Sequence, residues 1–165
     1  MDAGSAFIAG VRERLGDIRQ RLVTTLGRLQ PEDLTWRPNE ASNSVANLVI
    51  HICGNVRQRF RAGLGGAPDT RDRDAEFADR AAHTAQDLIR AVEDAFSEAD
   101  AILAALPAER LAETQAVRGQ ARTHLAMLLT AVSHYGEHLG QILYIAKLRQ
   151  GERFASLSVP LPGKR

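Results

Sequence analysis

Apolar residues recur every three or four positions along four long segments of the chain. These segments cover residues 5–29, 42–62, 79–106 and 122–149. Such spacing places the apolar side chains on one stripe of an α-helix, so each segment is predicted to form an amphipathic helix. Because the 165 residues contain four such segments and no convincing strand pattern, the sequence predicts an all-α four-helix bundle in a single domain, residues 1–165.

The segments between the predicted helices contain residues that end helices or form turns. Residues 31–42 begin with proline and contain Trp36, which we expect to fold back onto the core. Residues 69–79 are strongly charged and show little periodicity, which predicts a long surface loop. Gly151 is placed to cap the last helix, and residues 152–165 are expected to form a short extended tail.

Charge and hydropathy narrow the classes of function that this chain can serve. The 21 Lys and Arg residues nearly balance 20 Asp and Glu residues, for a net charge of +1, and no basic stripe of the kind that binds nucleic acid stands out. No segment approaches the roughly 18 consecutive apolar residues of a membrane span. With no secretory signal at its start and Cys53 as its single cysteine, the chain is expected to reside in the cytoplasm.

A pair of histidines in the last predicted helix is a candidate for metal binding. His134 and His138 are four residues apart, so their imidazoles share one face of the helix about one turn apart. The same face carries Ala131, Ile142 and Ile145, which directs the pair towards the bundle core. Two helical histidines at this spacing can bind one metal ion, and they can also belong to a hydrogen-bonded core.

A third histidine strengthens the metal hypothesis. His51 lies among strong hydrophobes in the middle of the second predicted helix, where it is either a satisfied core residue or a group that faces the last helix. In the second case, His51, His134 and His138 form a three-histidine set. Three neutral imidazoles suit a divalent transition metal such as zinc or nickel, and they leave one coordination position for water or substrate.

Four segments of the chain are similar to those of a known superfamily. They include the sequence SVANLVIHICGNVR at residues 44–57 and the sequence HYGEHLGQI at residues 134–142, of which the second is the most specific. The charged run RDRDAEF at residues 71–77 and the ending SLSVP at residues 156–160 accompany them. Together these segments resemble the DinB-like superfamily, and more narrowly an uncharacterised subfamily of it.

The resemblance implies a four-helix bundle with a metal site built from one histidine of the second helix and two of the fourth. His51, His134 and His138 match those three positions. Relatives in the superfamily include thiol-dependent enzymes that use mycothiol or bacillithiol, as isomerases or S-transferases. The resemblance therefore implies a small-molecule substrate, such as a low-molecular-weight thiol, and a homodimer as the assembly.

Other polar residues near the three histidines are candidates for orienting a ligand or contacting the substrate. Asn55 lies one turn after His51, and Gln141 lies three residues after His138. Metal ligands need outer partners of this kind, although a hydrogen bond between packed helices accounts for each residue equally well. Glu137 is adjacent to His138 but points about 100° away around the helix, so a role as general base is less favoured.

The remaining reactive side chains are interpreted as structural. Cys53 points roughly 200° away from His51 around the helix, so it is predicted to be a small buried hydrophobe and not a nucleophile or ligand. His83 lies in a charged stretch, and His124 lies near the start of the last helix. Neither histidine is predicted to have a special role.

Several functions remain open from the sequence. One is a metal-dependent enzyme, either a thiol-dependent transferase or a hydrolase. Another is a bundle that binds a metal or a small ligand without turnover, and a third is a purely structural bundle. The fourth coordination position separates them, because a position open to a cavity favours an enzyme and a position closed by a fourth side chain favours the others.

Overall fold

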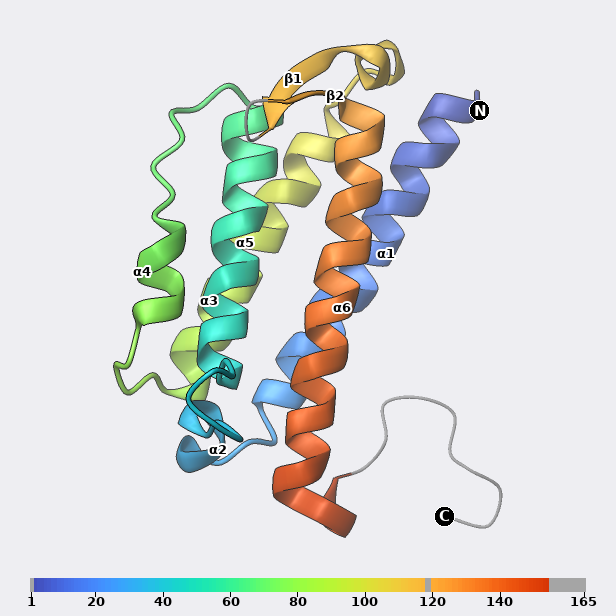
Figure 1. The fold of residues 1–165 in the computed structure, drawn as a ribbon. Helices are drawn as coiled ribbons and strands as arrows, with labels where there is room; N and C mark the ends of the chain where they lie inside the picture. The colour runs from blue at the N-terminus through green and yellow to red at the C-terminus, as the bar shows by residue number, and fades with distance from the viewer. Residues whose placement is uncertain (1, 118–119, 155–165) are drawn as a thin grey trace.

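Four long helices pack together in the computed structural model of this chain, which describes residues 2–117 and 120–154 (Figure 1). The long helices are α1 (Ala3–Leu26), α3 (Val45–Val56), α5 (Ala85–Ala104) and α6 (His124–Gln150). Helices α1 and α3 each contact both α5 and α6, so the four helices enclose one shared core. The predicted all-α four-helix bundle is confirmed.

Helices α1 and α6 begin where the sequence provides capping groups. Asp2 accepts a hydrogen bond from the Ser5 backbone N–H at the start of α1, and Thr123 accepts one from the Ala126 N–H at the start of α6. Gly151 ends α6 with a φ of 56°, which is a conformation that glycine adopts at less cost than residues with a Cβ atom. The predicted C-cap is therefore confirmed.

The predicted apolar stripes meet in the core of the bundle. The large side chains that are most completely buried come from all four long helices and include Ile18, Leu22, Leu26, Ile52, Leu88, Leu103, Met127, Leu128, Tyr135 and Leu139. Removing such side chains from water contributes about 25 cal/mol per Å² of apolar surface. This burial is the main favourable term that holds the helices together.

The second predicted helix differs from the structure at both ends. Helix α3 starts at Val45, because Ser44 caps it, so the predicted start at residue 42 is early. After Val56 the chain continues as a π-helical segment, η1 (Arg57–Leu64). The apolar periodicity continues through this change of helix type, which is why the sequence predicts one uninterrupted helix.

A short helix, α2 (Pro31–Thr35), lies within the segment predicted to be a loop. Proline ends a preceding helix, yet it is also favoured in the first turn of a new one, and Pro31 has the second role here. Leu34 of this helix is fully buried. Trp36 packs against the core as predicted.

The prediction of a surface loop for the charged segment 69–79 is wrong. Residues Arg73–Ala78 form helix α4, which packs along α3 (Figure 1). Helix α5 accordingly starts at Ala85, behind its cap Thr84, and not at residue 79. The single buried side chain of α4 is Glu76, so this helix has no apolar stripe from which it could be predicted.

A two-stranded antiparallel hairpin joins α5 to α6 after a 3₁₀ turn, η2 (Ala108–Ala112). Its strands are β1 (Thr114–Val117) and β2 (Gln120–Thr123), with Thr114 opposite Thr123. The sequence pattern predicts no strand, and it places the start of the last helix at residue 122, which falls inside β2. Strands of four residues are too short for an alternating pattern to stand out.

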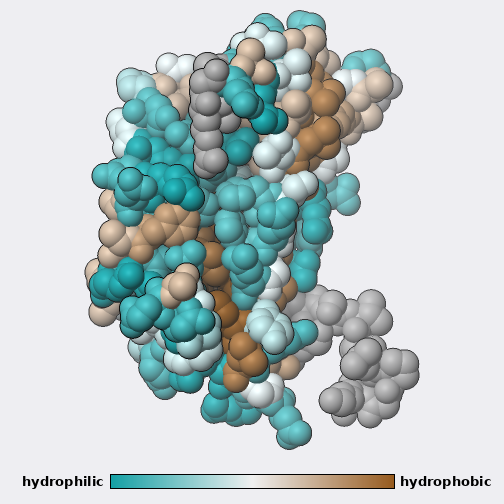
Figure 2. All heavy atoms as spheres, in the orientation of Figure 1, coloured by the Kyte–Doolittle hydropathy of each residue, from teal (hydrophilic) through white to brown (hydrophobic). Residues whose placement is uncertain are grey.

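Hydrophilic side chains cover most of the face shown in Figure 2, and a narrow apolar band reaches the surface between α3 and the lower half of α6. In the described part of the chain, the large apolar side chains that are exposed lie on α6, namely Leu125, Leu129, Tyr144 and Leu148. A homodimer remains a prediction. Among the described residues, every helix is too short or too polar to cross a membrane.

The predicted extended tail can be compared with the structure only at its start. Residues Gly151–Arg153 form a single 3₁₀ turn, η3, and Phe154 is buried against the core. Residues 155–165 lie outside the described residues.

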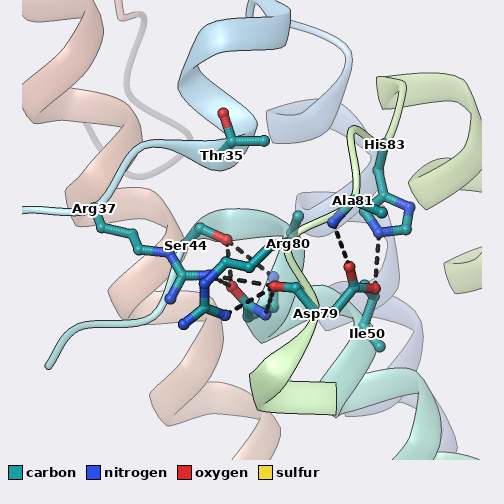
Figure 3. Close-up of a pocket in the computed structure, with 10 residues that line it drawn as sticks. Thr35, Arg37, Ser44, Ile50, Asp79, Arg80, Ala81 and His83 are labelled. Carbon is teal, nitrogen blue, oxygen red and sulfur yellow. Dashed lines mark hydrogen bonds and ion pairs between the residues drawn. The ribbon is translucent and has the colours of Figure 1, made fainter. Parts of the chain in front are cut away.

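A buried asparagine attaches the end of α4 to α3. Asn47 Nδ2 donates to the backbone oxygen of Glu76 (2.9 Å) and to that of Asp79 (3.0 Å). Figure 3 shows the adjoining pocket, where the Asp79 carboxylate faces the Ala81 backbone and the His83 ring. Because these carbonyls lie at or beyond a helix end, Asn47 satisfies them and holds α4 through its main chain.

Gly54 allows the middle of α4 to approach α3 closely. A Cβ atom at residue 54 would lie 2.0 Å from Glu76 Oε1 and 3.4 Å from Arg71 Nε. Gly54 is three residues after His51, and residues at this spacing share a helix face. The carboxylate of Glu76 therefore reaches the face of α3 that carries His51 only because residue 54 has no side chain.

We expect Gly54→Ala to lower the free energy of unfolding by about 1–3 kcal/mol, because the added methyl group must displace the buried Glu76 carboxylate. Gly10→Ala is the matched control, since Gly10 lies inside α1 and has no atom within 4 Å of an added Cβ. This control should raise the stability by up to about 1 kcal/mol. Urea denaturation measures both, and a stabilising effect of equal size in the two variants would contradict the close approach of α4.

Candidate metal centre

Three histidines from two helices meet inside the bundle. His51 comes from α3, and His134 and His138 come from α6, with their candidate ligand nitrogens all within 4.8 Å of one another. His51 is buried, and His134 and His138 are half-buried. The structure therefore brings together the three residues that the sequence singled out, and their action as ligands stays a prediction.

The distance between two of the rings has the size expected for a shared ion. His51 Nε2 lies 3.1 Å from His134 Nε2. Two nitrogens that each bind one zinc ion at about 2.0–2.1 Å, with an angle of about 90–110° between them, are roughly 2.9–3.4 Å apart. The same distance also suits an N–H···N hydrogen bond between the two rings.

The surroundings of the other ring nitrogens decide which atoms can face a metal. His51 Nδ1 lies 2.9 Å from Glu76 Oε2, and His138 Nδ1 lies 3.0 Å from Gln141 Oε1. Each of these contacts leaves Nε2 as the nitrogen with a free lone pair. His138 Nε2 is buried and has no hydrogen-bond partner among the described residues.

Burial keeps the α6 histidines neutral. Burial, together with the smaller effect of the neighbouring His138 and His51 rings, lowers the pKa of His134 to about 4. Burial also lowers the pKa of His138, against an opposing hydrogen bond with Gln141. Neutral imidazoles at pH 7 offer the lone pairs that a metal ligand needs.

Glu76 and Arg71 complete the site on the side away from α6. Arg71 Nε donates to Glu76 Oε1 (2.7 Å), and Arg71 Nη2 donates to Glu76 Oε2 (2.8 Å). Burial alone would raise the pKa of the Glu76 carboxyl group, but the hydrogen bonds from Arg71 and His51 outweigh it, so the pKa is lowered. Glu76 is therefore an ionised carboxylate beside His51 at neutral pH.

Sequence reasoning missed both of these residues. They belong to the charged run at residues 71–77, which the lack of periodicity predicts to be part of a solvated loop. The similarity of that run to the DinB-like subfamily is the signal by which the sequence could point to these residues. Hydrophobic periodicity does not reveal a single buried acidic residue. The charge pattern alone does not distinguish Glu76 from the exposed Asp74.

The two predicted outer residues have different surroundings. Gln141 contacts His138 through its side-chain oxygen. Asn55 is buried, and its Oδ1 accepts hydrogen bonds from Tyr135 Oη (3.0 Å) and Arg59 Nε (2.7 Å). Asn55 thus links α3 to α6 next to His134, whose ring lies 5.7 Å from that of Tyr135.

The other reactive side chains lie apart from the three histidines. Cys53 is buried, and burial raises the pKa of its thiol to about 12, so the group is an uncharged thiol at neutral pH. His83 Nε2 lies 2.9 Å from Asp79 Oδ2 at the end of α4. His124 is buried in the first turn of α6, and Glu137 is exposed.

Comparisons with known proteins assign the chain to a family. It matches the family described as Protein of unknown function (DUF1572) over residues 2–163. The chain belongs to this family. The fold of this DUF1572 member is similar to the crystal structure of a DinB-like protein from Bacillus subtilis, with a TM-score of 0.67 and 18% sequence identity.

That similarity covers 94% of this chain and 99% of the Bacillus subtilis chain. It shows that this DUF1572 chain shares its fold with that DinB-like protein. A comparison with curated protein sequences finds no match.

We expect the metal-free protein to lose stability as the pH falls from about 6.5 towards 4. The pKa of His134 is lowered from 6.5 to about 4, so the unfolded chain takes up a proton in this range before the folded chain does. In His134→Asn the loss over the same range should be smaller, with His138 still contributing. Thermal unfolding with a chelator present measures this, and identical pH profiles for the two proteins would contradict the desolvation of His134.

Proposed function

We propose that this chain binds one divalent transition metal ion, zinc or nickel, through Nε2 of His51, His134 and His138. The observation that carries the proposal is the convergence of three imidazoles, with His138 Nε2 buried and without a partner among the described residues. A buried nitrogen left without a hydrogen bond costs about 1–3 kcal/mol. A bound ion would remove that cost.

The site supports an open coordination position. No fourth His, Cys, Asp or Glu side chain joins the three histidines in the described part of the chain. His134 and His138 are half-buried, so part of each ring lies at the surface on the α6 side. These features favour an enzyme or a ligand-binding protein over a closed structural site.

The chemistry that we propose for this position is thiol-dependent group transfer. His51, His134 and His138 would hold the ion, which would supply a lowered pKa for a small ligand in the open position, so that a low-molecular-weight thiol would be a nucleophile at neutral pH. The chain itself contributes imidazole lone pairs in fixed directions, because Glu76 orients the His51 ring and Gln141 orients the His138 ring. The core residues around Tyr135 exclude water from the inner side.

Elemental analysis of the purified protein tests metal binding. We expect about one zinc or nickel ion per chain in the wild type and its loss in His138→Ala. His83→Ala is the control, because His83 contacts Asp79 and lies outside the three-histidine set. An absence of metal in the wild type, even after incubation with zinc and nickel, would refute the proposal.

Thiol binding is tested with the cobalt-substituted protein, whose visible spectrum reports the ligands of the ion. Addition of a low-molecular-weight thiol should produce a new sulfur-to-cobalt absorption band, because the three histidines leave a position for it. The same addition to His138→Ala should give no band. If metal-loaded wild type shows no change with any thiol, the transferase proposal fails, and assays for hydrolysis become the next step.

A further inference from the structure

A chain of three buried, hydrogen-bonded side chains runs from α4 and the segment just before it into the site. The side chains of Arg71, Glu76 and His51 are only 5%, 7% and 4% exposed. Taking an ion pair out of water costs several kcal/mol per ion, and the mutual attraction of the charges offsets this only when the geometry is good. Buried charges at this depth therefore call for a role that an apolar contact could not fulfil.

Attachment of α4 does not explain the buried charges. Asn47 already binds the backbone oxygens of Glu76 and Asp79, and Arg37 Nη2 also donates to the Asp79 oxygen, so the end of α4 is held without the Arg71–Glu76 pair. Arg71 and Glu76 would satisfy each other through their two parallel hydrogen bonds. Yet Glu76 Oε2 also lies 2.9 Å from His51 Nδ1, and residue 54 is a glycine where a methyl group would block this position.

The chemistry of the contact determines the protonation of the ring. Arg71 Nη2 lies 3.1 Å from His51 Nδ1 and could donate its second hydrogen there only if Nδ1 were unprotonated, which would set the Nδ1 lone pair against the Glu76 carboxylate at 2.9 Å. A carboxylate has only acceptors, so His51 Nδ1 carries the hydrogen and donates it to Glu76. The lone pair of His51 is then on Nε2, which faces His134.

His51 differs in this respect from the neighbouring His138. The outer partner of His138 is the neutral amide of the exposed Gln141, whereas the outer partner of His51 is a buried carboxylate. A charged acceptor makes a stronger hydrogen bond than a neutral one, and it raises the basicity of the opposite nitrogen. It also offsets the positive charge of Arg71, which would otherwise oppose a cation at the site.

We propose that Glu76, held by Arg71, is a positioning residue of the three-histidine site that fixes the His51 ring with Nδ1 protonated and Nε2 directed at the ion. This inference rests on the proposed metal function. It extends the site to α4 and gives the charged run at residues 71–77 a role in metal affinity.

Glu76→Gln is the main test, with Asp74→Asn as the matched control, because Asp74 is an exposed carboxylate on the same helix. Zinc affinity is measured by competition with a chelator. We expect Glu76→Gln to bind zinc about 10–100-fold more weakly, and Asp74→Asn to bind it like the wild type. Wild-type affinity in Glu76→Gln would overturn the proposal.

Nitrogen NMR of the histidine rings gives a readout that a merely structural role would not move. In the metal-free wild type, His51 should be the tautomer with Nδ1 protonated. In Glu76→Gln it should become a mixture of tautomers, because a glutamine side chain can donate as well as accept. An unchanged single tautomer would count against the proposal.

A double variant separates positioning from stability. Arg71→Met combined with Glu76→Met removes both charges, and replacing a buried ion pair with apolar residues is often neutral or stabilising. This protein should keep the stability of the wild type and still bind zinc at least about 10-fold more weakly. Wild-type zinc affinity in the double variant would overturn the role of Glu76, whereas absence of zinc from the wild type itself would overturn the proposed metal function.

Discussion

Packing of α3 against α6 brings His51 Nε2 to 3.1 Å from His134 Nε2, and the remainder of the site depends on this contact. Burial of the rings keeps His134 neutral and leaves His138 Nε2 without a partner in the described part of the chain. A fold that buries polar nitrogens in this way loses stability, which the apolar core must offset. A bound ion would return part of that stability, so metal binding and folding of this chain would be linked.

The site is built in layers that start at its centre. The three imidazoles form the innermost layer, and Glu76 and Gln141 fix the rings of His51 and His138 from outside. Arg71 in turn orients Glu76 through two hydrogen bonds. Helix α4 therefore belongs to the site as much as α3 and α6 do, although no residue of α4 is a candidate ligand.

The parts of the fold that follow from the sequence are those with a long local repeat. The stripes of α1, α5 and α6 span several turns, and the spacing of His134 and His138 places both on one face whatever the rest of the chain does. Gly151 could be predicted as a cap because it lies next to the end of such a repeat. The parts that do not follow from the sequence depend on contacts between distant residues.

Glu76 and Asn55 show this dependence on distant contacts in two ways. Glu76 is buried only because Gly54 leaves room for it and Asn47 binds its carbonyl oxygen, and none of these residues has a distinctive local pattern. Asn55 lies one turn after His51 as predicted, but Tyr135 and Arg59 bind its oxygen. Helical spacing predicts neither the burial of Glu76 nor the hydrogen-bond partners of Asn55.

X-ray absorption at the zinc edge of the zinc-loaded protein tests the three-histidine site most directly. We predict three imidazole nitrogens at about 2.0–2.1 Å, a further light ligand in the open position, and no sulfur from the protein. A sulfur ligand at about 2.3 Å in the absence of added thiol would place the ion at Cys53, and a shell of oxygen atoms alone would place it on surface carboxylates. Either result would contradict a metal site formed by His51, His134 and His138.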